Sequence, residues 1–435
     1  MSLWVQKQRM GQTSKALPRI YSLFFLGGPM ALRLLLILCA LGACGPAETP
    51  EGPSGNKPGP SPEPEPEPAE LAVDCILERS EDFGPVGETT FDVDVVVSGL
   101  SIPWSIDWMP DGTLLVTERD GRLASVAPGS SRAVAAAQVD VTSSGEGGLL
   151  GLAIHPDFAS NDWFYLYYTA DGARGRENRV ERWTWNGGSP AFESTVVAAI
   201  PARQYHNGGR LRFGPDGKLY IGTGDAGDPD LSQDPESLAG KLLRVNDDGT
   251  IPADNPWPGS AAWLIGLRNT QGFDWREDGR IVITDHGPSG LRPEGGRRNH
   301  DELNVAEPGD NLGWPEIYKC ETQAGMVSPS MTWARALPPG GTVRYTGTEI
   351  PEFEGDLFIG VLGFGADVGQ LHRVRLADDG NVTLNEVYLR GAGGYGRLRD
   401  VVMGPDGGMY VTTSNCDGRG DCGEGDLVLR IGRSR

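Results

Sequence analysis

A turn-and-strand unit recurs six times along the chain and constrains the fold more than any other feature. In its clearest form, Pro215-Asp216-Gly217 precedes the apolar run at residues 218–223. Proline presets the first turn dihedral, aspartate accepts local backbone hydrogen bonds, and glycine supplies a positive φ. The six units begin at Pro110, His155, Pro215, Glu277, Glu354 and Pro405.

Each turn leads into a short apolar run of the kind typical of a strand buried on both faces. A second strand often follows, as at residues 122–126 and 241–245. Six such units, in a chain with 63 glycines, predict an all-β fold and a six-bladed β-propeller over residues 91–435. Five or seven blades remain open, because the unit near Asp356 matches the pattern weakly. Closing the ring requires the last strand, residues 427–431, to pair with an early one.

Residues 1–44 have the pattern of an export signal, and the true start is expected near Met30. A basic start there precedes an apolar run at residues 34–41 that is too short to span a bilayer. Leu41-Gly42-Ala43-Cys44 resembles a bacterial lipobox. We therefore expect Cys44 to carry a lipid that anchors the chain to a membrane, facing the periplasm or the cell exterior. Ordinary cleavage and release is the alternative.

Residues 45–72 are rich in proline and glutamate and contain almost nothing apolar to bury. This composition predicts an extended tether, followed by an N-terminal extension at residues 73–90. The formal net charge of the whole chain is −21, which argues against nucleic acid as a partner.

Four cysteines remain beyond the export signal: Cys75, Cys320, Cys416 and Cys422. An even number in an oxidising compartment predicts two disulfides. Cys416 and Cys422 flank a short loop and are expected to pair locally, so that Cys75 would join Cys320, although three connectivities can be drawn. A zinc site is less favoured, because no Cys-x-x-Cys pair or neighbouring histidine pair occurs.

Short motifs lie between the repeats in a fixed order. They include Gly147-Gly148-Leu149-Leu150, His206-Asn207-Gly208-Gly209, Leu267-Arg268-Asn269, Asp285-His286-Gly287-Pro288, Asp301-Glu302-Leu303-Asn304, Asn311-Leu312-Gly313-Trp314 and Arg397-Leu398-Arg399-Asp400. Together they resemble the soluble pyrroloquinoline quinone (PQQ) sugar dehydrogenases, the glucose/sorbosone and aldose sugar dehydrogenase family, over residues 95–434. The resemblance implies an enzyme that oxidises aldose sugars at the anomeric carbon to lactones and passes electrons to a periplasmic or membrane-bound acceptor.

The resemblance assigns His206 as the general base that takes the proton of the anomeric hydroxyl. Histidine has the intrinsic pKa that such a base needs near neutral pH. A turn histidine bonded to the backbone is the plain alternative for this residue.

The resemblance also assigns residues to the cofactors, PQQ and calcium. Arg268, Asn269, Arg397 and Arg399 match cofactor-contacting positions, and arginine binds carboxylates such as those of PQQ bidentately. Calcium would be held by the carbonyl groups of Gly287 and Pro288. Asp301 and Glu302 match a second, structural calcium region loosely. The acidic run Asp225, Asp228, Asp230 and Asp234 is either another calcium site or a solvated loop.

Several positions depart from the pattern of the glucose-oxidising members. Glu146, which we place among the cofactor-binding residues, and His286 each stand where those members carry glutamine, and Tyr205 stands where they carry an acid. Residues 360–371 contain no lysine, although the family places one against the cofactor there. These departures bring the chain nearer to the aldose dehydrogenase branch. They keep open a cofactor-free binding propeller of the same superfamily or a calcium-dependent propeller lactonase.

Overall fold

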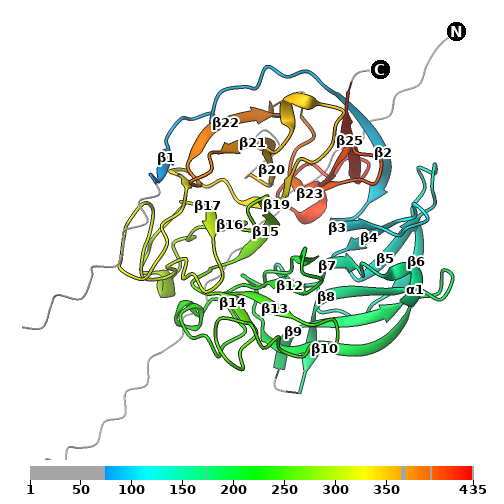
Figure 1. Cartoon of the computed structure of the whole chain (residues 1–435). Helices are drawn as coiled ribbons and strands as arrows, with labels where there is room; N and C mark the ends of the chain where they lie inside the picture. The colour runs from blue at the N-terminus through cyan, green and yellow to red at the C-terminus, as the bar shows by residue number, and fades with distance from the viewer. Residues whose placement is uncertain (1–73, 174, 364–368, 392–393, 434–435) are drawn as a thin grey trace, which may run out of the picture. The chain divides into compact units, whose positions relative to one another are not determined.

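The computed structural model describes residues 74–173, 175–363, 369–391 and 394–433. Within these residues the strands form six sheets, arranged as blades around a central axis (Figure 1). The six-bladed β-propeller predicted from the repeats is therefore confirmed. The predicted export signal with Cys44 and the predicted tether at residues 45–72 lie outside the described residues.

The blades follow one another along the chain, and the first strand of each lies next to the axis (Figure 1). Blade 1 holds β3 (Pro103–Trp108), β4 (Leu114–Glu118), β5 (Arg122–Val126) and β6 (Val134–Gln138). Blade 2 holds β7 (Leu149–Ile154), β8 (Trp163–Gly172), β9 (Gly175–Thr184) and β10 (Ala191–Pro201). Blade 3 holds β11 (Leu211–Phe213), β12 (Leu219–Gly222), β13 (Leu242–Val245) and β14 (Ala262–Leu264).

Among the remaining blades, blades 4 and 6 each include a strand from the start of the described chain. Blade 4 holds β15 (Thr270–Trp275), β16 (Ile281–Asp285), β17 (Glu302–Ala306), β18 (Met331–Trp333) and β1 (Ile76–Glu78). Blade 5 holds β19 (Pro339–Arg344), β20 (Leu357–Val361), β21 (Gln370–Leu376) and β22 (Val382–Tyr388). Blade 6 holds β23 (Leu398–Met403), β24 (Met409–Thr413), β25 (Asp426–Gly432) and β2 (Asp92–Leu100).

Helical segments are short and lie between strands. They are α1 (Phe158–Asn161) and the 3-10 turns η1 (Pro229–Ser232), η2 (Arg292–Glu294), η3 (Pro351–Phe353) and η5 (Asn415–Asp417). None of the helices among the described residues has the length and apolar character needed to cross a bilayer.

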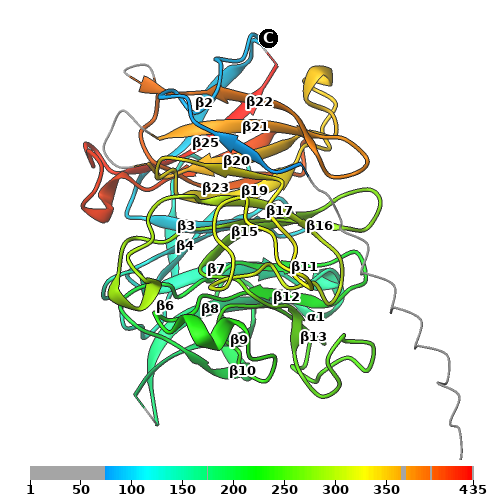
Figure 2. The same ribbon diagram turned by 90° about the vertical axis from the view of Figure 1, so that its left-hand side faces the viewer.

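The recurring turns join the first strand to the second strand in each blade. In blade 3, Gly217 adopts a φ of 71°, and Asp216 Oδ1 accepts a hydrogen bond from the backbone N–H of Lys218 at 3.1 Å. The aspartates at residues 111, 278 and 406 make the same contact two residues ahead. The repeat in the sequence is therefore a self-capped hairpin turn, and these turns lie at one end of the propeller (Figure 2).

The core consists of six apolar clusters, one between each pair of neighbouring blades. Adjacent residues of β8 show why the strands are apolar on both faces: Phe164 packs toward blade 1, whereas Tyr165 packs toward blade 3. Both side chains are fully buried. A blade is thus stabilised chiefly by contact with its two neighbours.

Strand β2 closes the ring by pairing with the last strand, β25, as in the partners Val95 and Leu429. The N-terminal residues before it also cross neighbouring blades. Strand β1 runs parallel to β18, Cys75 forms a disulfide with Cys320, and Val86 bridges to Val387 in blade 5. The second disulfide joins Cys416 to Cys422, so the predicted pairing is confirmed.

Buried and half-buried charges tie the first strands together around the axis. Asp107, Asp274 and Asp400 each accept a backbone N–H from the first strand of the next blade, at 2.8, 2.7 and 3.2 Å. Arg210 forms an ion pair with Asp400 at 2.8 Å and donates to the Gln271 carbonyl at 2.8 Å. Its guanidinium also lies over the Trp104 ring, 4.6 Å from the ring centroid.

Removing each disulfide tests how much it contributes to the free energy of unfolding. Cys75 and Cys320 are separated by 245 residues, and Cys416 and Cys422 by 6. Since the longer loop restricts the unfolded chain more, Cys75→Ser with Cys320→Ser is expected to lower the free energy of unfolding by about 2–5 kcal/mol. Cys416→Ser with Cys422→Ser should lower it less. Denaturant unfolding of both variants measures the difference, and the reverse order would contradict this account.

Candidate active site

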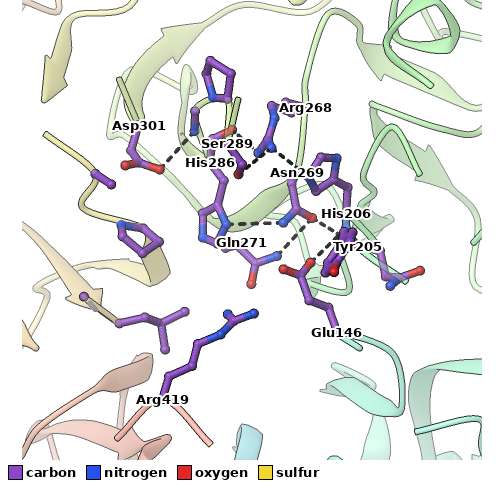
Figure 3. Close-up of a pocket in the computed structure, with 18 of the residues that line it drawn as sticks. Glu146, Tyr205, His206, Arg268, Asn269, Gln271, His286, Ser289, Asp301 and Arg419 are labelled. Atoms are coloured by element: carbon purple, nitrogen blue, oxygen red, sulfur yellow. Dashed lines mark hydrogen bonds between the residues drawn. The ribbon is translucent and has the colours of Figure 1, made fainter. Parts of the chain in front are cut away.

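A cavity of about 450 Å³ lies at the end of the propeller opposite the hairpin turns. Its walls come from the segments that precede the first strands and from the loops that follow the second strands. All eight predicted site residues line it: Glu146, His206, Arg268, Asn269, Gly287, Pro288, Arg397 and Arg399. Figure 3 shows several of these side chains converging on the cavity. The structure thus gathers residues that are far apart in the sequence, while their individual roles stay predictions.

His206 is held by contacts on both ring nitrogens. It lies between β10 and β11 with a φ of 57°, and only 4% of the residue is exposed. Its Nδ1 lies 2.6 Å from Asp225 Oδ1, and its Nε2 lies 2.7 Å from Arg268 Nη2. A guanidinium can only donate, so Nε2 must be the acceptor and Nδ1–H must donate to Asp225. This tautomer leaves Nε2 without a hydrogen.

Asp225 is itself fixed from several sides. The carboxylate is completely buried, and its second oxygen accepts the indole N–H of Trp314 at 2.9 Å. The backbone N–H of Gly227 donates to Oδ1 at 2.7 Å. A buried carboxylate held by these donors fixes the orientation of the His206 ring.

Arg268 connects His206 to the next loop. Its guanidinium donates to Glu294 Oε1 from both Nε and Nη2, at 2.8 and 2.5 Å, and both side chains are 2% exposed. It also reaches the His286 carbonyl at 3.1 Å and Ser289 Oγ at 3.0 Å. The buried Glu294 therefore balances the charge of Arg268 beside the imidazole.

Two carboxylates hold the loops that carry these groups. Asp285 accepts the backbone N–H groups of Arg268 and Asn269, each at 2.6 Å. Burial raises the pKa of Asp285 to about 6, although these two donors oppose the shift. Asp301 accepts the backbone N–H groups of Gly287 and Leu337, at 3.0 and 2.6 Å. These contacts place the cavity's polar groups through the backbone.

Glu146 supports the His206 loop from blade 2. Its Oε2 accepts the backbone N–H of His206 at 2.8 Å. Burial alone would raise the pKa of Glu146, but its pKa lies below the ordinary value, and the hydrogen bond from the His206 backbone contributes to this lowering. Glu146 is therefore an anion at neutral pH and stands opposite the cavity's arginines.

His286 is a neutral member of the cavity. Burial lowers its pKa to about 3, although the nearby Glu146 opposes the shift. Its Nε2 lies 2.7 Å from the Pro339 carbonyl and must donate there, so Nδ1 accepts the Asn269 amide at 3.3 Å. Asn269 in turn accepts the backbone N–H of Gly208 at 3.0 Å.

Arg397 and Arg399 both face the cavity, as their spacing predicts, but their surroundings differ. Arg397 forms an ion pair with Asp417 at 2.8 Å and donates to the carbonyls of Ser414, Leu362 and Gly363. The side-chain hydrogen bonds of Arg399 to the described residues are long, at 3.2 Å to Ser414 Oγ and 3.4 Å to Gln271 Oε1. Burial lowers the pKa of Arg399 to about 9, and the nearby Arg119 and Arg397 add to this while Asp417 opposes it.

Sequence reasoning missed the residues that position the others: Asp225, Asp285, Glu294 and Trp314. Asp225 had been grouped with the acidic run, but it is buried on His206, whereas Asp228, Asp230 and Asp234 are exposed. Across the described ranges, no three histidine, cysteine or acidic side chains gather as a metal site. The available signal was the position of Asp225 in a glycine-rich loop three residues after a buried strand.

Comparison with known proteins places the chain in a family. The sequence profile of the glucose/sorbosone dehydrogenases matches residues 100–428. Aldose sugar dehydrogenase YliI of Escherichia coli (strain K12) is 31% identical over 356 residues, covering 76% of this chain and 91% of that protein. Quinoprotein glucose dehydrogenase B of Acinetobacter calcoaceticus is 30% identical over 277 residues, covering 56% of each.

A solved structure agrees with these sequence matches. The PQQ-bound form of aldose sugar dehydrogenase from Streptomyces coelicolor has a TM-score of 0.69 and 34% sequence identity, and the match covers 79% of this chain and 98% of that chain. With this fold, this cavity and a profile match over most of its length, the chain belongs to the glucose/sorbosone dehydrogenase family.

Proposed function

We propose that the protein is a PQQ- and calcium-dependent dehydrogenase that oxidises aldose sugars at the anomeric carbon to lactones. One observation carries this proposal: His206 presents a hydrogen-free Nε2 to a cavity that is also lined by arginines. The names of the relatives, an aldose sugar dehydrogenase and a quinoprotein glucose dehydrogenase, support the same chemistry.

The cavity fits PQQ in size and charge. Its volume of about 450 Å³ lies in the range of small-molecule sites. Arg399 is 7% exposed and, among the described residues, forms no ion pair with a carboxylate, which is costly for a buried cation unless an anion binds. When bound, PQQ would supply the acceptor for the hydride that leaves the anomeric carbon. Arg399, Arg397, Arg268, Asn269 and Glu146 would hold it.

His206 would act as the general base. Its Nε2 takes the proton of the anomeric hydroxyl, and the contact with Arg268 Nη2 gives way to the substrate. Asp225 keeps Nδ1–H oriented and stabilises the imidazolium that forms. Arg268 remains neutralised by Glu294, so its charge does not oppose protonation of the ring as strongly as that of a free arginine.

The carbonyls of Gly287 and Pro288 would hold a calcium ion beside the cofactor. Among the described residues, no hydrogen bond reaches the Gly287 carbonyl, while Asp301 fixes the Gly287 backbone through its N–H. A free carbonyl on a rigid loop suits a hard cation, which would act there as a Lewis acid.

A second, structural calcium would lie at Glu302. Burial raises the pKa of Glu302 well above the ordinary value, with Asp285 and Asp301 adding to the shift. Three buried oxygens around it lack a partner, on Asn304, Ser330 and Thr332. Asn304 follows two residues along β17, and Thr332 is the strand partner of Glu302, so they share one face of the sheet. A divalent cation would satisfy all these groups at once.

Export is part of the proposal. Two disulfides suit an oxidising compartment outside the cytoplasm. The lipobox at Cys44 and the charged tether behind it would keep the domain at a membrane surface, within reach of an electron acceptor there.

Replacing His206 tests the base. His206→Ala is expected to lower kcat by about 10²- to 10⁴-fold, as for loss of a general base, and to leave PQQ bound. Dye-linked turnover of an aldose panel, with PQQ titrated by absorbance, measures both quantities. His155→Gln, outside the cavity, is the control. An unchanged rate would remove His206 from the mechanism, and a wild-type protein that binds no PQQ with calcium present would favour the cofactor-free binding propeller.

Replacing Asp225 tests the tautomer. In Asp225→Asn the amide can donate to Nδ1, which moves the ring hydrogen to Nε2 and blocks proton uptake there. By analogy with other carboxylate–histidine pairs, kcat should fall by about 10²- to 10⁴-fold while the PQQ Kd stays close to the wild-type value. Wild-type turnover in this variant would show that the Asp225 contact is not needed for catalysis.

Calcium removal tests the structural site without PQQ. Calcium at about a hundredfold above its Kd should stabilise the wild type by about 2.7 kcal/mol, and EGTA should abolish this. Glu302→Gln should lose the part of this stabilisation that the structural site contributes, whereas Asp230→Asn, in the exposed acidic run, should keep all of it. Thermal unfolding with and without calcium measures the shift. Equal stabilisation of Glu302→Gln and wild type would exclude this site.

A further inference from the structure

The cavity is strongly cationic although the chain as a whole is anionic. Six arginines line it: Arg119, Arg268, Arg298, Arg397, Arg399 and Arg419. The acidic residues that line it are Glu146, Asp301 and Asp417. Glu294 neutralises Arg268, Asp417 neutralises Arg397, and Asp301 directs its oxygens at backbone N–H groups. An excess of positive charge therefore remains.

Two of these arginines have no partner. Across the described residues, the guanidinium groups of Arg119 and Arg419 make no hydrogen bond and no ion pair. Arg119 follows β4 and is partly buried. Burial lowers its pKa, and the like charges of Arg419 and Arg397 add to this, while Asp417 and Glu146 oppose it. Cations left together in this way favour an incoming anion.

The loop that carries Arg419 is built to hold it over the cavity. Asp417 joins the loop to Arg397 through Oδ2 and accepts the backbone N–H of Arg419 through Oδ1, at 2.8 and 3.0 Å. The Cys416–Cys422 disulfide closes the loop, and Asp426 accepts the backbone N–H of Cys416 at 3.2 Å. Figure 3 shows the Arg419 side chain extending from this loop into the pocket.

We propose that Arg119 and Arg419 bind carboxylates of PQQ and thereby replace the lysine that is absent from residues 360–371. This inference rests on the proposed function. Among the described residues, four cavity arginines, Arg119, Arg298, Arg399 and Arg419, form no ion pair with a carboxylate, and PQQ carries three carboxylates. Arginine suits this task because its planar fork donates two parallel hydrogen bonds to one carboxylate. The cofactor thus supplies the anions that the cavity itself lacks.

Cofactor binding to charge-removing variants tests the proposal. Arg119→Gln and Arg419→Gln should each raise the PQQ Kd by about 10- to 100-fold, as for loss of a hydrogen bond to a charged group, and the double variant more. Absorbance titration of the calcium-loaded protein gives the Kd, and the PQQ-induced rise in Tm gives an independent readout. Arg132→Gln removes an exposed arginine outside the cavity lining and should leave both unchanged.

The outcomes separate this inference from the proposed function. Since neither side chain has a partner, the variants should unfold at the wild-type Tm when PQQ is absent. Variants that bind PQQ as tightly as a PQQ-binding wild type would overturn the inference alone. The same holds if only the KM for acidic sugars rises, because the arginines would then serve the substrate. A wild type that binds no PQQ would overturn both proposals.

Discussion

Arg210 is the point on which the propeller and its cavity both depend. The first strand of each blade has no neighbouring strand on the side that faces the axis, so its backbone and side chains need partners from other blades. Arg210 lies directly before β11 of blade 3. It contacts Ser105 of blade 1, the Gln271 carbonyl of blade 4 and Asp400 of blade 6, and so joins four blades at once. A lost partner there would leave a buried charge, which is far costlier than a lost surface contact.

The same residue ties the fold to the chemistry. Arg210 lies four residues after His206, Gln271 lies two after Asn269, and Asp400 directly follows Arg399. The three segments that carry the base and the cofactor-facing groups therefore meet at one buried guanidinium beneath the cavity. Their relative positions are set by the closure of the ring, and the loops above it need to fix only the last few residues.

The sequence predicted the parts of this protein that rest on local physics. The hairpin turns could be predicted because a Pro-Asp-Gly sequence favours the turn conformation by itself. Asp216, for example, accepts a hydrogen bond from the backbone N–H of Lys218. The eight site residues could be named because their motifs resemble those of a known family. The structure brings all eight to one cavity. The contacts between distant loops could not be read in this way. The position of Asp225 after a buried strand does not indicate which residue it binds, and nothing near Asp417 indicates that it neutralises Arg397.

The N-terminal segment before β2 determines where a mechanical load would enter the domain. A pull on the chain before residue 74 would reach Cys75 first, and the disulfide to Cys320 would pass the force into blade 4 as a covalent link. Strand β2 begins further along the chain than Cys75. The β2–β25 hydrogen bonds that close the ring would therefore bear the force only after the disulfide. A force applied at that end would therefore reach the disulfide and blade 4 before it reached the β2–β25 pairing that closes the ring.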